Sequence, residues 1–104
     1  MEIFEEREKG FEERYRRQQE MAFKTEKRRD KLAGLWAAQR LGLSGDAADA
    51  YARSVVEAGL GGAGKVAAKL LDDLQAGGVA ATAEDVRIEM IRLHDVAHDQ
   101  IAAG

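Results

Sequence analysis

Three stretches of this sequence contain residue types at spacings that could do chemistry, and the first is a glycine-rich loop. GLGGAGKV, residues 59–66, nearly matches the phosphate-binding pattern G-x-x-x-x-G-K-[ST]. In that pattern the last hydroxyl binds magnesium and a strand precedes the loop. Here Val66 replaces the hydroxyl, and no alternating strand pattern precedes the loop. We therefore predict a flexible loop between two helices, and only a weak nucleotide contact at the next helix N-terminus stays open.

The second stretch holds two histidines that are four residues apart. His94-Asp95 and His98-Asp99 place two imidazoles one helical turn from each other, which is a spacing that metal sites use. No third ligand can be placed beside them from the sequence. We therefore interpret the pair as a partly exposed helix edge and predict no metal site.

The third stretch is KTEKRRDK, residues 24–31, whose basic residues raise the question of a nucleic-acid contact. Glu26 and Asp30 interrupt its basic residues, and residues 1–31 hold nine acidic and ten basic side chains, a net charge of only +1. A surface that follows phosphates needs a clear basic excess. We therefore predict a solvated helix face and no nucleic-acid partner.

No Ser/His/Asp or Cys/His set stands out, so the sequence predicts a protein that is not an enzyme. The 104 residues include no cysteine, which excludes disulfides and thiolate metal sites and fits a reducing compartment. No apolar run approaches the ~20 residues that a membrane span needs. These features predict a soluble, cytoplasmic protein without a cofactor.

The elements that position these residues are helices. The chain has no proline and is rich in Ala, Leu, Glu, Lys and Arg, which favours helices. Glycine-containing turns separate four predicted helices, at about 20–41, 45–58, 65–76 and 82–102. Gly42 suits a left-handed C-terminal position, Ser44 suits an N-cap, and Thr82 with Asp85 resembles a capping box. We predict an all-α fold, a small four-helix bundle with a flexible, partly helical N-terminal arm.

Apolar residues at spacings of three and four mark one face of each helix in the bundle. Small side chains on the second and fourth helices predict close helix approach, and Trp36 is the largest candidate for the core. The apolar residues are Leu32, Leu35, Trp36; Ala48, Tyr51, Ala52, Val55; Val66, Ala67, Leu70, Leu71, Leu74; and Val86, Met90, Leu93, Ala97, Ile101.

The arm contains the repeated tetrad FEER at residues 4–7 and 11–14. The seven-residue step places Phe4 and Phe11 on one helical face, and Tyr15 extends that face by a turn. Between this face and Trp36 the same stripe becomes polar. Its polar members are Gln18, Thr25 and Arg29. We therefore predict that the aromatic end projects beyond the bundle core.

The arm is predicted to be a marginal helix that a partner completes. Favourable i,i+4 ion pairs add ~0.2–0.5 kcal/mol each, whereas Gly10 inside the helix costs ~1 kcal/mol. The pairs are Glu5–Lys9, Glu12–Arg16, Glu13–Arg17 and Glu20–Lys24.

From residue 23 onward, FKTEKRRDKLAGLWAAQRLGLSGDAADAYARSVV resembles the zeta-subunit family of alphaproteobacterial F-type ATP synthases. The specific motifs are RR-x-KL-x-GLWAA-x-x-LGL-x-G and AYA-x-x-VV, and the arm and the terminal IAAG also fit. The resemblance implies a four-helix bundle whose N-terminal segment inhibits ATP hydrolysis. In this family the segment inserts into a catalytic subunit interface, as the mitochondrial inhibitor protein does.

On this resemblance, residues 1–19 form the inhibitory arm and residues 20–104 the bundle. The implied partner is the catalytic head of the synthase (alpha, beta and gamma subunits), which would hold the protein at the cytoplasmic side of the inner membrane. The alternative is a regulatory bundle that binds adenine nucleotide or another protein without inhibiting the ATPase. The predicted partner-binding residues are Phe4, Glu5, Arg7, Phe11, Glu12, Arg14 and Tyr15.

Overall fold

The computed structural model describes the backbone of residues 2–104 and the side chains of residues 9–104. It contains four helices: α1 (Glu2–Arg40), α2 (Gly45–Gly59), α3 (Ala63–Ala76) and α4 (Ala83–Ala103). No strand occurs in this part of the chain, so the predicted all-α bundle is confirmed. Each predicted helix is present, and the largest difference within the bundle is that α3 begins two residues early, at Ala63.

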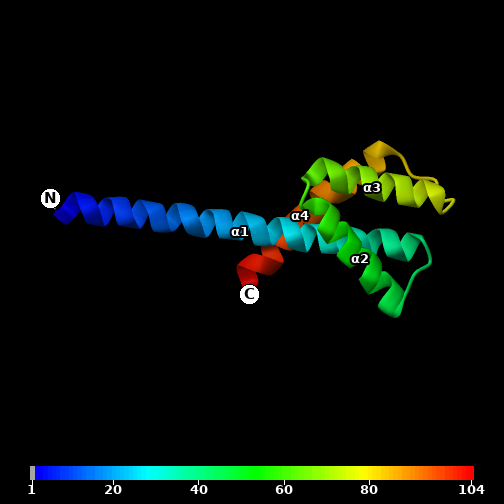
Figure 1. The fold of residues 1–104 in the computed structure, drawn as a ribbon, viewed down its shortest axis with the longest axis horizontal. Helices are drawn as coiled ribbons and strands as arrows, with labels where there is room; N and C mark the ends of the chain where they lie inside the picture. Colours follow the sequence, from blue (N-terminus) through cyan, green and yellow to red (C-terminus); the bar gives the residue numbers. More distant parts are fainter. Residues whose placement is uncertain (1) are drawn as a thin grey trace.

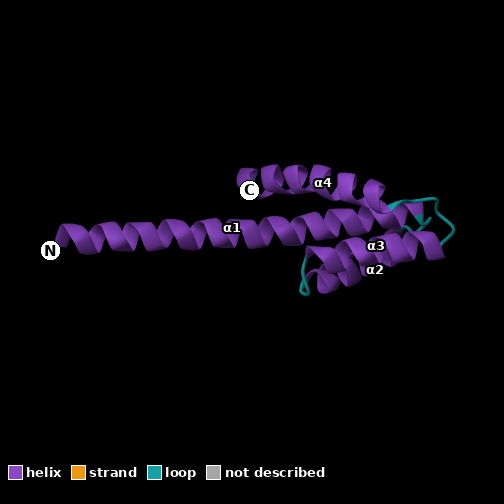
Figure 2. Ribbon diagram, turned by 90° about the horizontal axis from the view of Figure 1, so that it is seen from above, coloured by secondary structure: helices purple, strands orange, loops and turns teal. Residues whose placement is uncertain are grey.

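The molecule is elongated, with extents of 64 × 26 × 20 Å, because α1 is much longer than its neighbours. Figure 1 shows the N-terminal half of α1 extending alone beyond the other helices. Figure 2 shows α4 on one side of α1 and the α2–α3 pair on the other. The C-terminal half of α1 therefore lies in the centre of the bundle.

The core confirms the predicted faces of α2, α3 and α4 but differs on α1. Its fully buried large side chains include Val55, Val66, Leu70 and Leu74. On α1 the buried apolar side chains are alanines at positions 33, 37 and 38, while Leu32 and Trp36 are only partly buried, at the edge of the core. Small residues face inward on α1 because α1 is the central helix and its neighbours approach it closely.

The closest helix approach is at Gly34. A Cβ atom placed there would lie 2.7 Å from the Ala52 Cα atom and 3.2 Å from the Val55 Cβ atom. Ordinary carbon contacts are ~3.5–4.0 Å, so only glycine fits at this crossing of α1 and α2. The predicted close approach of α2 through Ala52 is confirmed, and Gly34 is the partner that the sequence pattern did not indicate.

The helix ends follow the turn chemistry. Gly42 has φ 77°, in the left-handed region that favours glycine. Thr82 and Asp85 form the predicted capping box, since each side chain accepts a hydrogen bond from the other residue's backbone N–H. Ser44 is the N-cap of α2, but its side chain makes no capping hydrogen bond.

A partly buried set of hydrogen bonds joins α2 to α3. The Tyr51 hydroxyl donates to Asp73 Oδ2 at 2.8 Å, and Lys69 Nζ lies 3.0 Å from the same oxygen. Burial, reinforced by the Asp73 carboxylate, raises the pKa of the Tyr51 phenol well above its usual range. Tyr51 therefore stays a neutral donor, which suits a structural role.

Within the described residues, none of the helices has the length and apolar character that crossing a membrane requires.

Candidate partner-binding surface

The N-terminal half of α1 presents two large aromatic side chains to solvent. Phe11 is 72% exposed and Tyr15 is 57% exposed. The two residues are four positions apart, so they lie one turn from each other on one helical face. Every residue from 11 to 20 is exposed. The chain itself therefore does not bury this aromatic pair.

The hydrogen bond and the ion pair around this aromatic pair both join residues of α1. The Gln19 side-chain amide donates to the Tyr15 hydroxyl at 2.8 Å. Arg17 and Glu13 form an ion pair at 3.7 Å, with both side chains mostly exposed. The predicted pairs Glu12–Arg16 and Glu20–Lys24, whose side chains the structure describes, are not among its ion pairs. Exposed pairs of this kind add little stability.

Four of the seven predicted partner-binding residues have described side chains, and all four are exposed on α1. They are Phe11, Glu12, Arg14 and Tyr15. The side chains of Phe4, Glu5 and Arg7 lie outside the described ones, although the backbone there belongs to α1. The role of all seven in binding stays a prediction.

At the root of the arm, two of the three polar residues that interrupt the stripe are packed into the bundle, while the third, Gln18, is exposed. Thr25 is 2% exposed, and Arg29 is mostly buried. We expected this polar gap to end the core, but α4 continues along α1 and packing extends to Thr25. A direct link between the two helices is the hydrogen bond from Arg28 Nη1 to Gln100 Oε1 at 2.9 Å. The sequence did not indicate that α4 reaches this far along α1.

Asp30 is the buried acid at the junction of α1 with the end of α2. Its Oδ1 atom accepts hydrogen bonds from Arg29 Nε and Nη2, both at 3.1 Å. Burial raises the pKa of the Asp30 carboxyl above its ordinary value of 3.8, and the Arg29 guanidinium partly opposes that rise. A Cβ atom at Gly59 would collide with the Asp30 carboxylate. Gly59 therefore makes room for a buried charged group, a constraint that sequence spacing could not reveal.

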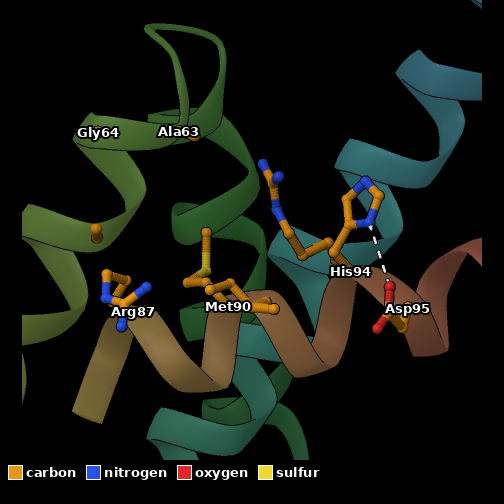
Figure 3. A pocket seen from close by; sticks show the side chains of 9 residues that line it. Ala63, Gly64, Arg87, Met90, His94 and Asp95 are labelled. Atoms are coloured by element: carbon orange, nitrogen blue, oxygen red, sulfur yellow. Dashed lines mark ion pairs between the residues drawn. The ribbon is translucent and has the colours of Figure 1, made fainter. Parts of the chain in front are cut away.

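A largely apolar cavity of about 470 Å³ lies where the N-terminal end of α3 meets α4. In Figure 3, Arg87, Met90, His94 and Asp95 of α4 lie opposite Ala63 and Gly64 of α3. Arg29 of α1 also lines the cavity. Its two arginines already pair with carboxylates, because Arg87 Nε donates to Glu84 Oε2 at 2.9 Å and Arg29 binds Asp30. The cavity therefore offers an apolar wall and few uncommitted cations.

The phosphate-loop resemblance has a structural explanation. Val66, which replaces the expected hydroxyl, is fully buried in the core. Gly62 is the N-cap of α3 with φ 107°, a conformation that favours glycine. The loop follows helix α2 directly, whereas a phosphate-binding loop follows a strand. The prediction of an interhelical loop is confirmed.

The two histidines lie at an exposed edge of α4, as predicted. The His94 and His98 side chains are 47% and 56% exposed, and each Nδ1 atom lies 3.8–3.9 Å from the carboxylate of the next residue. Among the side chains of residues 9–104, no three His, Cys, Asp or Glu gather in a way that could hold a metal ion.

Comparisons with known proteins complete the description of this surface. A family model described as ATPase inhibitor subunit zeta matches residues 1–100, nearly the whole chain and including the arm. Searches of curated proteins and of solved structures found no significant match. The match covers both the aromatic arm and the bundle that the structure describes. The chain therefore belongs to the ATPase inhibitor subunit zeta family.

Proposed function

We propose that residues 1–19 inhibit ATP hydrolysis by inserting, as a helix, into a catalytic interface of the F-type ATP synthase. The family assignment makes the chain a regulatory inhibitor that binds ATP synthase and not an enzyme. The proposal adds the segment that acts and the place where it acts, namely the catalytic head with its alpha, beta and gamma subunits. The protein would then work at the cytoplasmic side of the inner membrane.

One observation carries this proposal: α1 continues far beyond the bundle and exposes Phe11 and Tyr15 on one face. An amphipathic helix that enters a groove is a common recognition mode, and it uses anchors at spacings of three, four and seven residues. Aromatic side chains dominate the energetics of such interfaces. The ordered helix would obstruct the interface movements that hydrolysis needs, and the bundle would stay outside.

The test adds the purified protein to the catalytic head of ATP synthase from the same source and measures ATP hydrolysis. We expect the full-length Phe11→Ala/Tyr15→Ala variant to inhibit at least ~30-fold more weakly, since interface anchors are worth ~2 kcal/mol or more when truncated. Matched controls are Leu60→Ala and Ile88→Ala, which remove apolar side chains of comparable exposure outside the arm. The controls should inhibit like the unmodified protein.

A second comparison uses a variant that lacks residues 1–19, with circular dichroism to verify that its helices are intact. Equal inhibition by this variant and by the full-length protein would refute the proposal. It would assign inhibition to the bundle.

The alternative function, regulation through adenine nucleotide, has one observation in its favour, the cavity beside the N-terminal end of α3. Helix N-termini attract anions, but the Arg29 and Arg87 guanidinium groups are already paired with carboxylates. Titration with ATP, followed by NMR of the α3 and α4 amides, distinguishes the two. Shifts near Gly64 and Met90 that saturate would support the alternative.

A further inference from the structure

The basic stretch at residues 24–31 is sorted by the helix into two faces. At ~100° per residue, four of its five cationic residues lie within ~100° of one another on α1, and the fifth, Arg29, points away and pairs with Asp30. The four are Lys24, Lys27, Arg28 and Lys31, all exposed. The acids that interrupt them in the sequence are elsewhere, because Asp30 is buried against Gly59 and Glu26 lies on the opposite side of the helix. The structure thus contains a basic face that a count of charges along the sequence does not reveal.

These four side chains line one groove, which we call the basic groove. Its volume is about 330 Å³, and it also contains Val56 of α2 and Ile101 of α4, both partly exposed. The groove therefore combines four cations with two aliphatic side chains. This combination suits a segment that carries both carboxylates and an apolar side chain.

The charges of the basic groove are not neutralised within the described part of the chain. No carboxylate of residues 9–104 forms an ion pair with any of the four cations. Arg28 has a neutral partner, Gln100, at 2.9 Å. Two acidic side chains of α2, Asp49 and Glu57, line an adjoining cavity, and Lys31 is the one residue of the four that also lines it. Four like charges spread over only ~10 Å of helix repel one another, so an acidic partner would relieve this repulsion.

The position of the groove identifies the partner. Lys24 follows the proposed inhibitory segment by five residues on the same helix, so a protein that receives the arm meets the basic groove next. We infer that the basic groove docks a carboxylate-rich segment of the same ATP synthase that receives the arm. This inference builds on the proposed function and adds a second contact to it.

A protein partner fits better than a nucleic acid. The chain has a net charge of −3, and Glu20 lies one turn before Lys24 on the same face. A duplex would bring its phosphates close to the Glu20 carboxylate as well as to the four cations. The aliphatic side chains of Val56 and Ile101 also have no counterpart in a phosphate backbone.

The test measures the association of the full-length protein with the purified catalytic head by surface plasmon resonance. The variant Lys24→Gln/Lys27→Gln keeps the side-chain stems and removes two charges from the groove. Its matched control, Arg53→Gln/Lys65→Gln, removes two exposed charges outside it. Because complementary charge acts mainly on association, we expect the groove variant to associate ~5- to 10-fold more slowly at low salt. The difference should largely disappear at ~0.5 M salt, where exposed charges are screened.

The outcomes separate this inference from the proposed function. If the arm does not insert, Phe11→Ala/Tyr15→Ala will bind like the unmodified protein while the groove variant still associates slowly. If the groove and control variants associate at the same rate, the basic groove does not dock the synthase, whatever the arm does.

Two further probes, a short DNA duplex and vesicles of equal parts phosphatidylcholine and phosphatidylglycerol, cover the other anionic partners. The inference would be overturned if either probe bound at physiological salt and lost binding in the groove variant. No binding to either probe, together with slow association of the groove variant, would support it.

Discussion

Replacing Gly10 by alanine tests whether the arm must become helical in order to inhibit. A Cβ atom at Gly10 would meet nothing within 4 Å, and the residue is not among the glycines with positive φ. The substitution therefore changes helix propensity without changing packing. Glycine inside a helix costs ~1 kcal/mol relative to alanine, so Gly10→Ala should stabilise the helical arm by about that amount.

The effect on inhibition follows from this free energy. If the free arm frays and orders on binding, Gly10→Ala removes ~1 kcal/mol of the ordering cost and should tighten inhibition by up to ~5-fold. The assays are helicity by circular dichroism and the concentration that half-inhibits ATP hydrolysis by the catalytic head. Gly64→Ala is the matched control, because a Cβ atom there also meets nothing and the residue lies in α3. It should leave inhibition unchanged.

Two results would contradict the reasoning. Higher helicity with unchanged inhibition would show that ordering of the arm is not part of binding. Weaker inhibition would show that binding needs a flexible joint at Gly10.

Three further predictions concern the bundle, and each is checked by measuring the free energy of unfolding. Gly34→Ala should lower it by about 1–2 kcal/mol, because overpacking against the Ala52 backbone outweighs the gain in helix propensity; an unchanged value would mean that α1 and α2 separate easily. Thr82→Ala should lower it by ~1 kcal/mol through loss of the capping box at α4, and no change would show that the cap is dispensable. Burial raises the pKa of the Asp30 carboxyl, so the folded protein binds the carboxyl proton more tightly than the unfolded chain does. The stability that this protonation contributes is lost as pH rises from about 3.8 through the pKa of the folded state. Asparagine at position 30 does not titrate, so the Asp30→Asn variant lacks this loss. The difference in free energy of unfolding, variant minus unmodified protein, should therefore increase as pH rises through that range; a decrease would show that the pKa of Asp30 is lowered by folding.

The bundle could be predicted from the sequence because local rules and packing agree there. Glycine turns, caps and apolar faces all indicate the same four helices, and Thr82 with Asp85 forms the capping box that the spacing predicts. Propensity and periodicity are local properties, so a single sequence displays them directly.

What could not be predicted is how the helices meet. The burial of Thr25 and Asp30 depends on α4 continuing along α1 and on Gly59 leaving space for a carboxylate. Both are relations between residues that are distant in the sequence. The same limit explains the incorrect emphasis on Trp36, which packs at the edge of the core while alanines and Gly34 occupy the centre of α1.

The continuity of α1 with the bundle limits the cost of ordering the arm. Starting a helix is the unfavourable step, and after that step each added residue gains a hydrogen bond that nearly balances its loss of entropy. The bundle already holds the C-terminal half of α1 as a helix, so ordering the arm extends an existing helix and does not start a new one. Gly10 is the weakest position in this extension, because glycine inside a helix costs ~1 kcal/mol relative to alanine. For this reason we expect Gly10→Ala to change inhibition by a factor of about five rather than by orders of magnitude.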